Sequence, residues 1–305
     1  MPTIHTIDLN YLGVPETIAS YLIVGPEGPV LIETGPESSS RNLTEGLNRL
    51  GYEPKDIAHA LVTHIHLDHA GAAGWLAEHG TTIHVHEFGA KHLIDPNKLI
   101  NSATRIYGDQ MDRLWGKIIP VPEERVRAVR DGETISVGGL TFTAIETPGH
   151  ARHHHAFALE TARGRICFTG DAAAMLVPGI PTDRYVSIPT PPPEFDLIAW
   201  LRSIDRLDDA RFKTLYPTHF GPVHTAAGHF VTLRRMLRSH VEFIRTMRRT
   251  TSDESELVRK YAIWTRRQAV NAGMSEAQIP HFVSDNLLRM NVTGIVRYLS
   301  QREAN

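Results

Sequence analysis

The chain has 305 residues, 41% of them hydrophobic and 22% charged, which is typical of a globular protein and excludes a disordered or fibrous one. The formal net charge of −2 excludes a surface built throughout to hold nucleic acid, and the single cysteine, Cys167, excludes an intrachain disulfide framework. Because no segment approaches the ~18 apolar residues of a membrane span and the first residues lack the features of a signal peptide, we expect a cytoplasmic protein without nucleic-acid or membrane partners.

The first part of the chain predicts strands that alternate with helices. Apolar runs at 20–24 and 29–33 are joined by Gly25-Pro26-Glu27-Gly28, which is typical of a hairpin. Leucines at helical spacing predict a helix over 38–50, which Gly51 can end. The same reasoning predicts a strand over 57–63, a helix over 70–79 and a strand over 82–86.

The middle of the chain predicts a polar helical insertion over 88–115 and then more strands. The further expected elements are strands at 133–137, 140–145, 165–169 and 213–216, and a helix at 196–208. The stretch 177–193 holds six prolines, which exclude a regular helix and predict a loop.

Beyond residue 230 the pattern is helical alone. Apolar residues recur at intervals of three and four from 233 to 247, and another face of the same helix carries Arg234, Arg238, Arg245 and Arg249. Residues 231–305 hold 13 Lys/Arg against 7 Asp/Glu. We interpret this excess either as a solvated helical face or as a cationic cover that attracts an anionic substrate.

The most informative motif is an HxHxDH cluster that directly follows the strand expected at 57–63. His64 and His66 lie two residues apart at a strand end, so their side chains point to the same side. Asp68 and His69 follow where a helix is expected to begin, which turns two more ligands toward the same space.

Three tight turns after predicted strands carry further residues of the same kind. Thr147-Pro148-Gly149-His150 presents an imidazole, Phe168-Thr169-Gly170-Asp171 a carboxylate, and Tyr216-Pro217-Thr218-His219 another imidazole. Imidazoles and carboxylates suit zinc and related divalent ions. Because a two-metal centre supplies its own nucleophile as a bound hydroxide, no Ser or Cys nucleophile is needed, and the pattern predicts hydrolysis.

The order HxHxDH, His150, Asp171, His219 resembles the metallo-β-lactamase-fold hydrolase superfamily over about residues 1–225. The resemblance implies an α+β fold, a four-layer αββα sandwich with the site at one edge of two sheets. It implies that one metal ion is held by His64, His66 and His150, and the other by Asp68, His69 and His219, with Asp171 bridging both. It also implies two domains, 1–230 with the dinuclear site and 231–305, a helical extension that roofs the substrate pocket.

Within the superfamily the chain is similar to the glyoxalase II and acyl-homoserine lactonase branches. These place a histidine four positions after the third ligand, here His154, where we expect a contact with the substrate or with a ligand. Relatives usually have Asp-Thr-Gly where this chain has Glu33-Thr34-Gly35, and Glu33 is a candidate for the same kind of role. Lactonases often have a tyrosine shortly after the bridging Asp, where this chain has Ala172-Ala173-Ala174-Met175. The other clustered histidines, His84, His86, His153 and His155, are interpreted as packing or surface residues.

We therefore expect a metal-dependent hydrolase in which a metal-bridging hydroxide attacks the carbonyl of a thioester, lactone or ester. Asp68 would orient the hydroxide and pass a proton to the leaving group, while Asp171 bridges the metals. The cofactors would be two zinc ions, with iron or manganese as alternatives that the same ligands accept. The partner would be a small-molecule substrate, with an anionic one as an option, and the sequence is compatible with a homodimer.

Two other functions of the same fold stay open from the sequence alone. One is a mono-iron sulfur dioxygenase, although such enzymes make less use of the second-metal ligands, all of which this chain has. The other is a non-catalytic regulator that keeps the metal site. A nuclease is disfavoured because we find no further nuclease-type motif and the net charge is slightly acidic.

Overall fold

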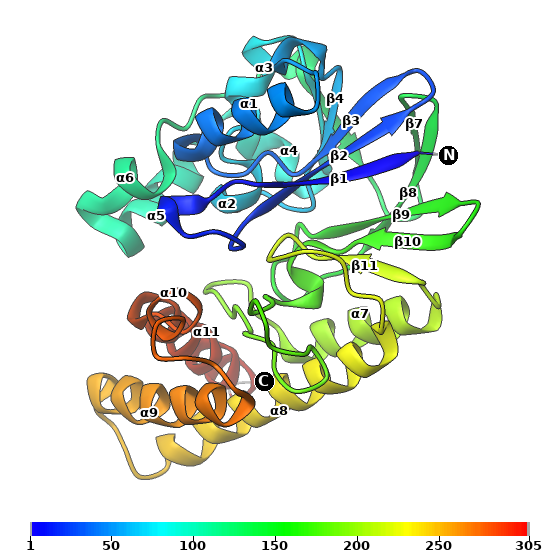
Figure 1. Ribbon diagram of the computed structural model, residues 1–305. Coiled ribbons are helices and arrows are strands. Elements are labelled where there is room, and N and C mark those ends of the chain that lie inside the picture. Colours follow the sequence, from blue (N-terminus) through cyan, green and yellow to red (C-terminus); the bar gives the residue numbers. More distant parts are fainter. Residues whose placement is uncertain (1, 304–305) are drawn as a thin grey trace. The chain divides into compact units, whose positions relative to one another are not determined.

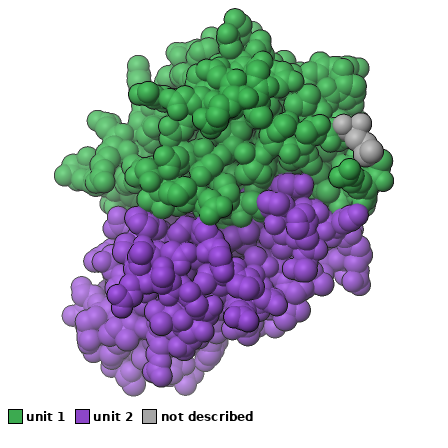
Figure 2. Space-filling view, in the orientation of Figure 1, with its two compact units in different colours: residues 1–146, 153–170, 218–221 green, residues 147–152, 171–217, 222–305 purple. Residues whose placement is uncertain are grey.

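The computed structural model describes residues 2–303, and the chain divides into two compact units (Figure 2). Unit 1 consists of Met1–Glu146, His153–Gly170 and Thr218–Gly221. Unit 2 consists of Thr147–Arg152, Asp171–Pro217 and Pro222–Asn305. The domain boundary expected at residue 230 and the pocket roof expected from 231–305 stay predictions.

Unit 1 contains a six-stranded sheet in which the strands follow one another in chain order. Its strands are β1 (Thr3–Asp8), β2 (Ala19–Gly25), β3 (Gly28–Ile32), β4 (His59–Leu61), β5 (Thr82–His86) and β6 (Val126–Val129). β1, β2 and β3 are antiparallel, whereas β3, β4, β5 and β6 run parallel. Because parallel strands end at the same edge, residues that directly follow β3 and β4 meet there.

Helices in the connections between the parallel strands cover one face of this sheet (Figure 1). The helices of unit 1 are α1 (Ser40–Arg49), α2 (Leu67–Ala70), α3 (Ala73–Glu78), α4 (Glu87–Ile94), α5 (Asn97–Tyr107) and α6 (Met111–Trp115). Leu43 and Leu47 of α1 and Leu76 of α3 share a buried core with Leu31 and Ile83 of the sheet. This core fixes the edge of the sheet from which the predicted ligands project.

A second, antiparallel sheet lies against the other face. Its strands in unit 1 are β7 (Thr134–Val137), β8 (Leu140–Glu146), β9 (His155–Thr161) and β10 (Gly164–Phe168), each paired with the next. The ring of Phe168 lies 5.6 Å from that of Tyr21 in the first sheet. Cys167 is fully buried in β10.

Unit 2 is mainly helical. Its elements are α7 (Leu197–Asp209), β11 (Thr214–Tyr216), α8 (Ala226–Arg248), α9 (Glu254–Ala272), α10 (Ile279–Phe282) and α11 (Asp285–Glu303). α8, α9 and α11 pack against one another (Figure 1). Arg234, predicted on a basic face of α8, binds Asp205 at 2.8 Å and Asp208 at 3.0 Å, so part of that face joins α8 to α7.

The proline-rich stretch is an irregular loop, as predicted, and its second half is held by a buried amide of α11. Asn291 accepts a hydrogen bond from the backbone N–H of Thr190 at 2.7 Å and donates one to the carbonyl of Ile188 at 2.8 Å. A side-chain amide can satisfy a donor and an acceptor at once, so it suits a loop that cannot pair its backbone in a sheet.

The fold class expected from the sequence is confirmed: two sheets are flanked by helices, and the C-terminal region is helical. Several element boundaries were wrong. The strand expected over 57–63 is confined to β4, the helix expected over 70–79 divides into α2 and α3, and β1, β6 and β9 were not anticipated. Among residues 2–303, no helix combines the length and apolar character needed to cross a membrane.

Candidate metal centre

The HxHxDH cluster occupies the loop after β4 and the short helix α2. His66 immediately precedes α2, whose first turn contains Asp68, and His69 follows one residue later. A carboxylate in the first turn of a helix is favoured by the partial positive charge there. His64 and His69 are fully buried and their rings lie 3.9 Å apart. The predicted helix start therefore does bring the histidines and the aspartate together.

His219 joins this cluster from the short segment Thr218–Gly221, which also belongs to unit 1. The carbonyl of Thr218 accepts a hydrogen bond from the backbone N–H of Ala19 at 2.8 Å, which holds the segment against β2. Oδ2 of Asp68 lies 3.5 Å from Nε2 of His219 and 3.8 Å from Nε2 of His69. One ligand atom from each of these three residues lies within 4.8 Å of the others, so the group could hold a metal ion.

Glu33, directly after β3, accepts hydrogen bonds from three other segments of unit 1. Its fully buried carboxylate accepts hydrogen bonds from Oγ1 of Thr63 at 2.5 Å, from Oγ1 of Thr218 at 3.0 Å and from Nδ1 of His69 at 3.1 Å. A fourth comes from the backbone N–H of Thr63 at 3.2 Å. Thr63 and Thr218 directly precede His64 and His219. The Glu33 carboxylate thus supports all three histidine positions, directly at His69 and through Thr63 and Thr218 at His64 and His219.

The protein acceptors around these histidines determine which ring nitrogen carries the proton. Nδ1 of His69 faces the Glu33 carboxylate, and Nδ1 of His219 lies 2.7 Å from the carbonyl of Thr17. Since these oxygens accept, Nδ1 is protonated in both rings, and in the neutral imidazole the lone pair is therefore on Nε2. Hydrogen bonds of this kind orient metal-binding histidines in proteins.

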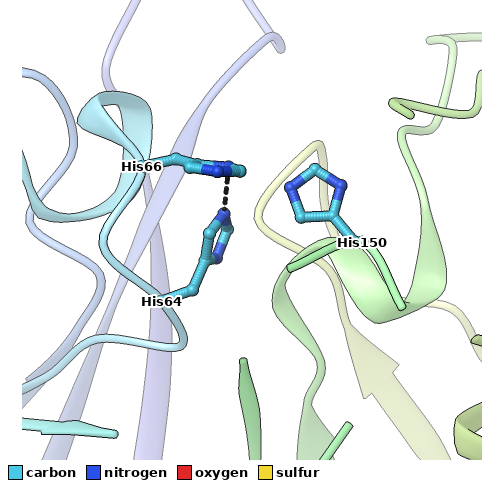
Figure 3. A group of neighbouring side chains, drawn as sticks. All are labelled: His64, His66 and His150. Carbon is cyan, nitrogen blue, oxygen red and sulfur yellow. Dashed lines mark hydrogen bonds between the residues drawn. The ribbon is translucent and has the colours of Figure 1, made fainter. Parts of the chain in front are cut away.

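His64 reaches the same state through Thr63. Nδ1 of His64 lies 3.1 Å from Oγ1 of Thr63, whose only proton is directed at the Glu33 carboxylate. The hydroxyl therefore accepts from Nδ1, and the lone pair of His64 is on Nε2. That Nε2 lies 2.9 Å from Nδ1 of His66 (Figure 3). Two nitrogens bound to one tetrahedral zinc are about 3.4 Å apart, so the pair is close to a ligand arrangement.

Unit 2 contributes the other two predicted ligands, His150 and Asp171. Nε2 of His150 lies 3.4 Å from Oδ2 of Asp171, and Nδ1 donates to the carbonyl of Pro189 at 3.0 Å. His150 therefore presents its Nε2 lone pair on the side of Asp171. Figure 3 draws His150 with the two histidines of unit 1.

The backbone after Asp171 is fixed by two buried side chains of unit 2. Nε1 of Trp200 in α7 donates to the carbonyl of Ala172 at 2.9 Å, and Nε2 of His229 in α8 lies 2.8 Å from the carbonyl of Ala173. Burial lowers the pKa of His229 to about 4, so this imidazole is neutral at pH 7. These contacts hold the turn that carries the carboxylate.

Glycine is required in both turns that precede these ligands. Gly149 has φ +136°, and a Cβ there would collide with the backbone of Trp200. Gly170 has φ +50°, and a Cβ there would collide with Thr63 and with Nε2 of His154. In both turns, neighbouring residues occupy the position where a Cβ would lie, so only glycine fits.

The predicted contact residue His154 is fully buried, and its ring lies 4.9 Å from that of His64. Its role at the substrate or at the ligands stays a prediction. The other clustered histidines, His84, His86, His153 and His155, are buried, and their interpretation as packing residues stays a prediction. The ring of His155 stacks on His86 at 4.3 Å, and Nε2 of His84 lies 3.2 Å from Nδ1 of His59.

Several residues that organise the centre were not identified from the sequence. Thr63 and Thr218 could have been noticed, because each is a threonine directly before a candidate ligand. Trp200 and His229 could not be identified from local sequence patterns, because each donates a hydrogen bond to the backbone of a segment far away in the chain.

Comparisons with known proteins identify the family of this chain. The model of the metallo-beta-lactamase superfamily matches residues 13–219. Metallo-beta-lactamase fold-containing protein ST1585 of Sulfurisphaera tokodaii is 28% identical over 224 residues, which cover 72% of this chain and 79% of that protein. The N-acyl homoserine lactonase of Bacillus cereus is 27% identical over 236 residues, covering 70% and 82%. The thioesterase pkgB of Emericella nidulans is 29% identical over 152 residues, which are 50% of this chain and 34% of that protein.

A solved structure has the same fold. The metallo-beta-lactamase family protein TTHA1429 from Thermus thermophilus matches 99% of this chain and 94% of its own chain, with a TM-score of 0.71 and 22% identity, which shows a shared fold. The family model spans more than half of the 305 residues and includes the whole HxHxDH cluster. This chain belongs to the metallo-beta-lactamase superfamily.

Proposed function

We propose that this chain is a metal-dependent hydrolase that cleaves the carbonyl of an ester, lactone or thioester. The five unit 1 residues His64, His66, Asp68, His69 and His219 and the unit 2 pair His150 and Asp171 would together hold two divalent metal ions, with Asp171 shared between them. Zinc suits this set of imidazole and carboxylate ligands, and iron or manganese would be accepted as well.

The observation that carries the proposal is the orientation of the imidazoles. His64, His69, His150 and His219 each direct Nδ1 at a protein oxygen, so the neutral form of each imidazole has its lone pair on Nε2. A packing histidine needs no such uniformity, whereas a metal ligand must present an unprotonated nitrogen.

The chemistry would be divided between the metal ions and the chain's own side chains. When bound, divalent metal ions lower the pKa of water and polarise a carbonyl oxygen. Asp68 is the one carboxylate of the set that is partly exposed, at 26%, and its Oδ2 lies beside His69 and His219. It is therefore placed to hold a proton from the attacking water and to release it to the leaving group.

The substrate class rests on the relatives. One relative is named an N-acyl homoserine lactonase and another a thioesterase. Both names describe cleavage of an activated carbonyl, with an oxygen or a sulfur leaving group. The proposal therefore includes both leaving groups, and neither the sulfur dioxygenase nor the regulator has a specific observation in its favour.

The decisive experiment combines metal analysis and hydrolysis on one freshly purified sample. We expect about two divalent ions per chain, as in two-metal hydrolases, and turnover of at least one member of a panel of esters, lactones and thioesters. Asp171→Asn should lower metal content and turnover together. The exposed Asp209→Asn is a matched control that should change neither.

Three results would contradict the proposal. One is full turnover by Asp171→Asn. Another is a single iron with oxygen uptake on a persulfide, which would favour the sulfur dioxygenase. The third is full metal content with no turnover across the panel, which would favour the non-catalytic regulator.

A further inference from the structure

An aromatic cluster lies beside Asp68 within unit 1. It consists of Tyr11, Tyr107 and Trp115. The ring of Trp115 stacks on Tyr11 at 5.9 Å with an interplanar angle of 19°, and meets Tyr107 edge to face at 5.1 Å. The cluster packs on Leu67, the residue before Asp68. The three rings therefore adjoin Asp68, the one candidate carboxylate ligand that is partly exposed.

The two tyrosines come from segments that are tied to the site. Tyr11 lies in the connection between β1 and β2, whose Thr17 carbonyl orients His219. The Asp8 carboxylate accepts hydrogen bonds from the backbone N–H groups of Asn10 at 2.8 Å and Glu16 at 2.9 Å, which fixes that connection. Tyr107 ends α5, in the polar insertion predicted from the sequence.

Neither phenol has a hydrogen-bond partner among residues 2–303, and both side chains are only partly buried. A buried tyrosine hydroxyl usually has a hydrogen-bond partner. Tyr261 is an example, since its hydroxyl lies 2.6 Å from Nδ1 of His240. Burial raises the pKa of Tyr11 and of Tyr107, and the negative charge of Asp68 raises both further. The hydroxyls therefore stay protonated within electrostatic reach of Asp68, as donors without a protein acceptor.

We propose that this cluster is the substrate-binding wall of the hydrolase. The partly exposed rings of Tyr11 and Tyr107, which the buried Trp115 holds in place, contact an apolar acyl or aryl group, and their hydroxyls donate to substrate oxygen atoms. This inference rests on the function proposed above and narrows its substrate class. The substrate is an oxygen ester or lactone of a hydrophobic carboxylic acid. A departing alkoxide needs a donor, which a phenol supplies, whereas a thiolate leaves with less help.

The test compares alkyl oxygen esters and alkyl thioesters of the same carboxylic acids. Tyr107→Phe and Tyr11→Phe should lower kcat/KM for oxygen esters by about 100-fold, as loss of a donor to a developing negative charge does, and should change it much less for thioesters. Metal content should match wild type. Tyr52→Phe is the control, because Tyr52 packs at the edge of the helix-covered core, and it should leave both rates unchanged.

Acyl chain length tests the apolar part of the wall. In the wild type, kcat/KM should rise by about fourfold for each added methylene that becomes buried. Trp115→Ala should flatten this rise, and Trp115→Phe, which is less disruptive to folding, should flatten it partly. A series that is flat in the wild type would overturn the inference.

Calorimetric binding of a medium-chain carboxylic acid, the expected product, separates the two proposals. If the wild type hydrolyses no carbonyl substrate, the proposed function fails, and the acid still probes the wall. Weaker binding by Tyr107→Phe and Trp115→Phe than by Tyr52→Phe would support the wall. Equal binding by all variants, or equal loss of oxygen-ester and thioester turnover, would overturn it.

Discussion

Replacing Glu33 should weaken both the fold and the metal centre, because one buried carboxylate satisfies four donors. In Glu33→Ala the hydroxyls of Thr63 and Thr218, the N–H of Thr63 and Nδ1 of His69 all lose their acceptor. Removing one partner of a buried charged network costs about 3–5 kcal/mol. The wild type also holds Glu33 at φ +65°, a conformation that costs about 1–3 kcal/mol and persists because these bonds compensate for it.

Glu33→Gln gives a graded comparison. Its amide oxygen can occupy the position of Oε1, which accepts three of the four bonds, while its NH₂ group would face the N–H of Thr63. One mismatched donor costs about 1–3 kcal/mol, so this variant should be less destabilised than Glu33→Ala. Metal affinity should fall by about 10–100-fold in Glu33→Ala, because His69 and Thr63 lose their acceptor, and by less in Glu33→Gln, which keeps an acceptor for both side chains.

The assay is urea unfolding of the metal-free chain, followed by circular dichroism, so that metal binding does not contribute to stability. Affinity is measured separately by competition with a chelator. The control is Glu45→Ala, since Glu45 is 49% exposed and pairs with Arg41 on the surface, and its effect should stay within about 0.5 kcal/mol. If metal-free Glu33→Ala unfolds at the same urea concentration as the wild type, the reasoning about this carboxylate is refuted.

Three further predictions concern the turn after Asp171, the helical region and the metal. His229→Leu removes the donor to the Ala173 carbonyl and should lower metal affinity by about tenfold, which His229→Gln should restore in a chelator competition. Burial lowers the pKa of His240 to about 3, so the unfolded chain binds the extra proton and stability falls as pH drops below 6.5. Between pH 7 and 5 the wild type should lose about 2 kcal/mol more than His240→Gln in urea unfolding, and equal losses would contradict this. Removal of metal by a chelator should abolish hydrolysis and lower the thermal midpoint, and added zinc should restore both; turnover that survives chelation would exclude a metal-dependent mechanism.

The elements that were predicted well depend on local patterns. The hairpin of β2 and β3 follows from two apolar runs around a glycine-proline turn, and α1 follows from leucines at helical spacing. β9 was not predicted because it begins at His155, in a run of three histidines that does not have the apolar pattern of a strand. The helix after the HxHxDH cluster divides near Gly71, where a Cβ would collide with the carbonyl of Leu67.

The identities of the candidate ligands could be read from the sequence, but their orientation could not. Each ligand follows a strand, and strand ends gather at one edge of a sheet. The oxygens that set the proton positions of His150 and His219 are backbone carbonyls of Pro189 and Thr17, which any residue could supply. Glu33 meets Thr218 across 185 positions of the chain, a contact that only the closed tertiary structure reveals.

The side-chain amide of Asn291 affects His150 as well as the loop that it binds. It forms hydrogen bonds with the backbone of Ile188 and Thr190, on either side of Pro189. The carbonyl of Pro189 accepts a hydrogen bond from Nδ1 of His150 and so orients that imidazole. A side chain close to the end of the chain thereby governs a ligand near its middle. Removing α11 would leave every candidate ligand in the sequence, but the Pro189 carbonyl, and with it the imidazole of His150, would lose its support.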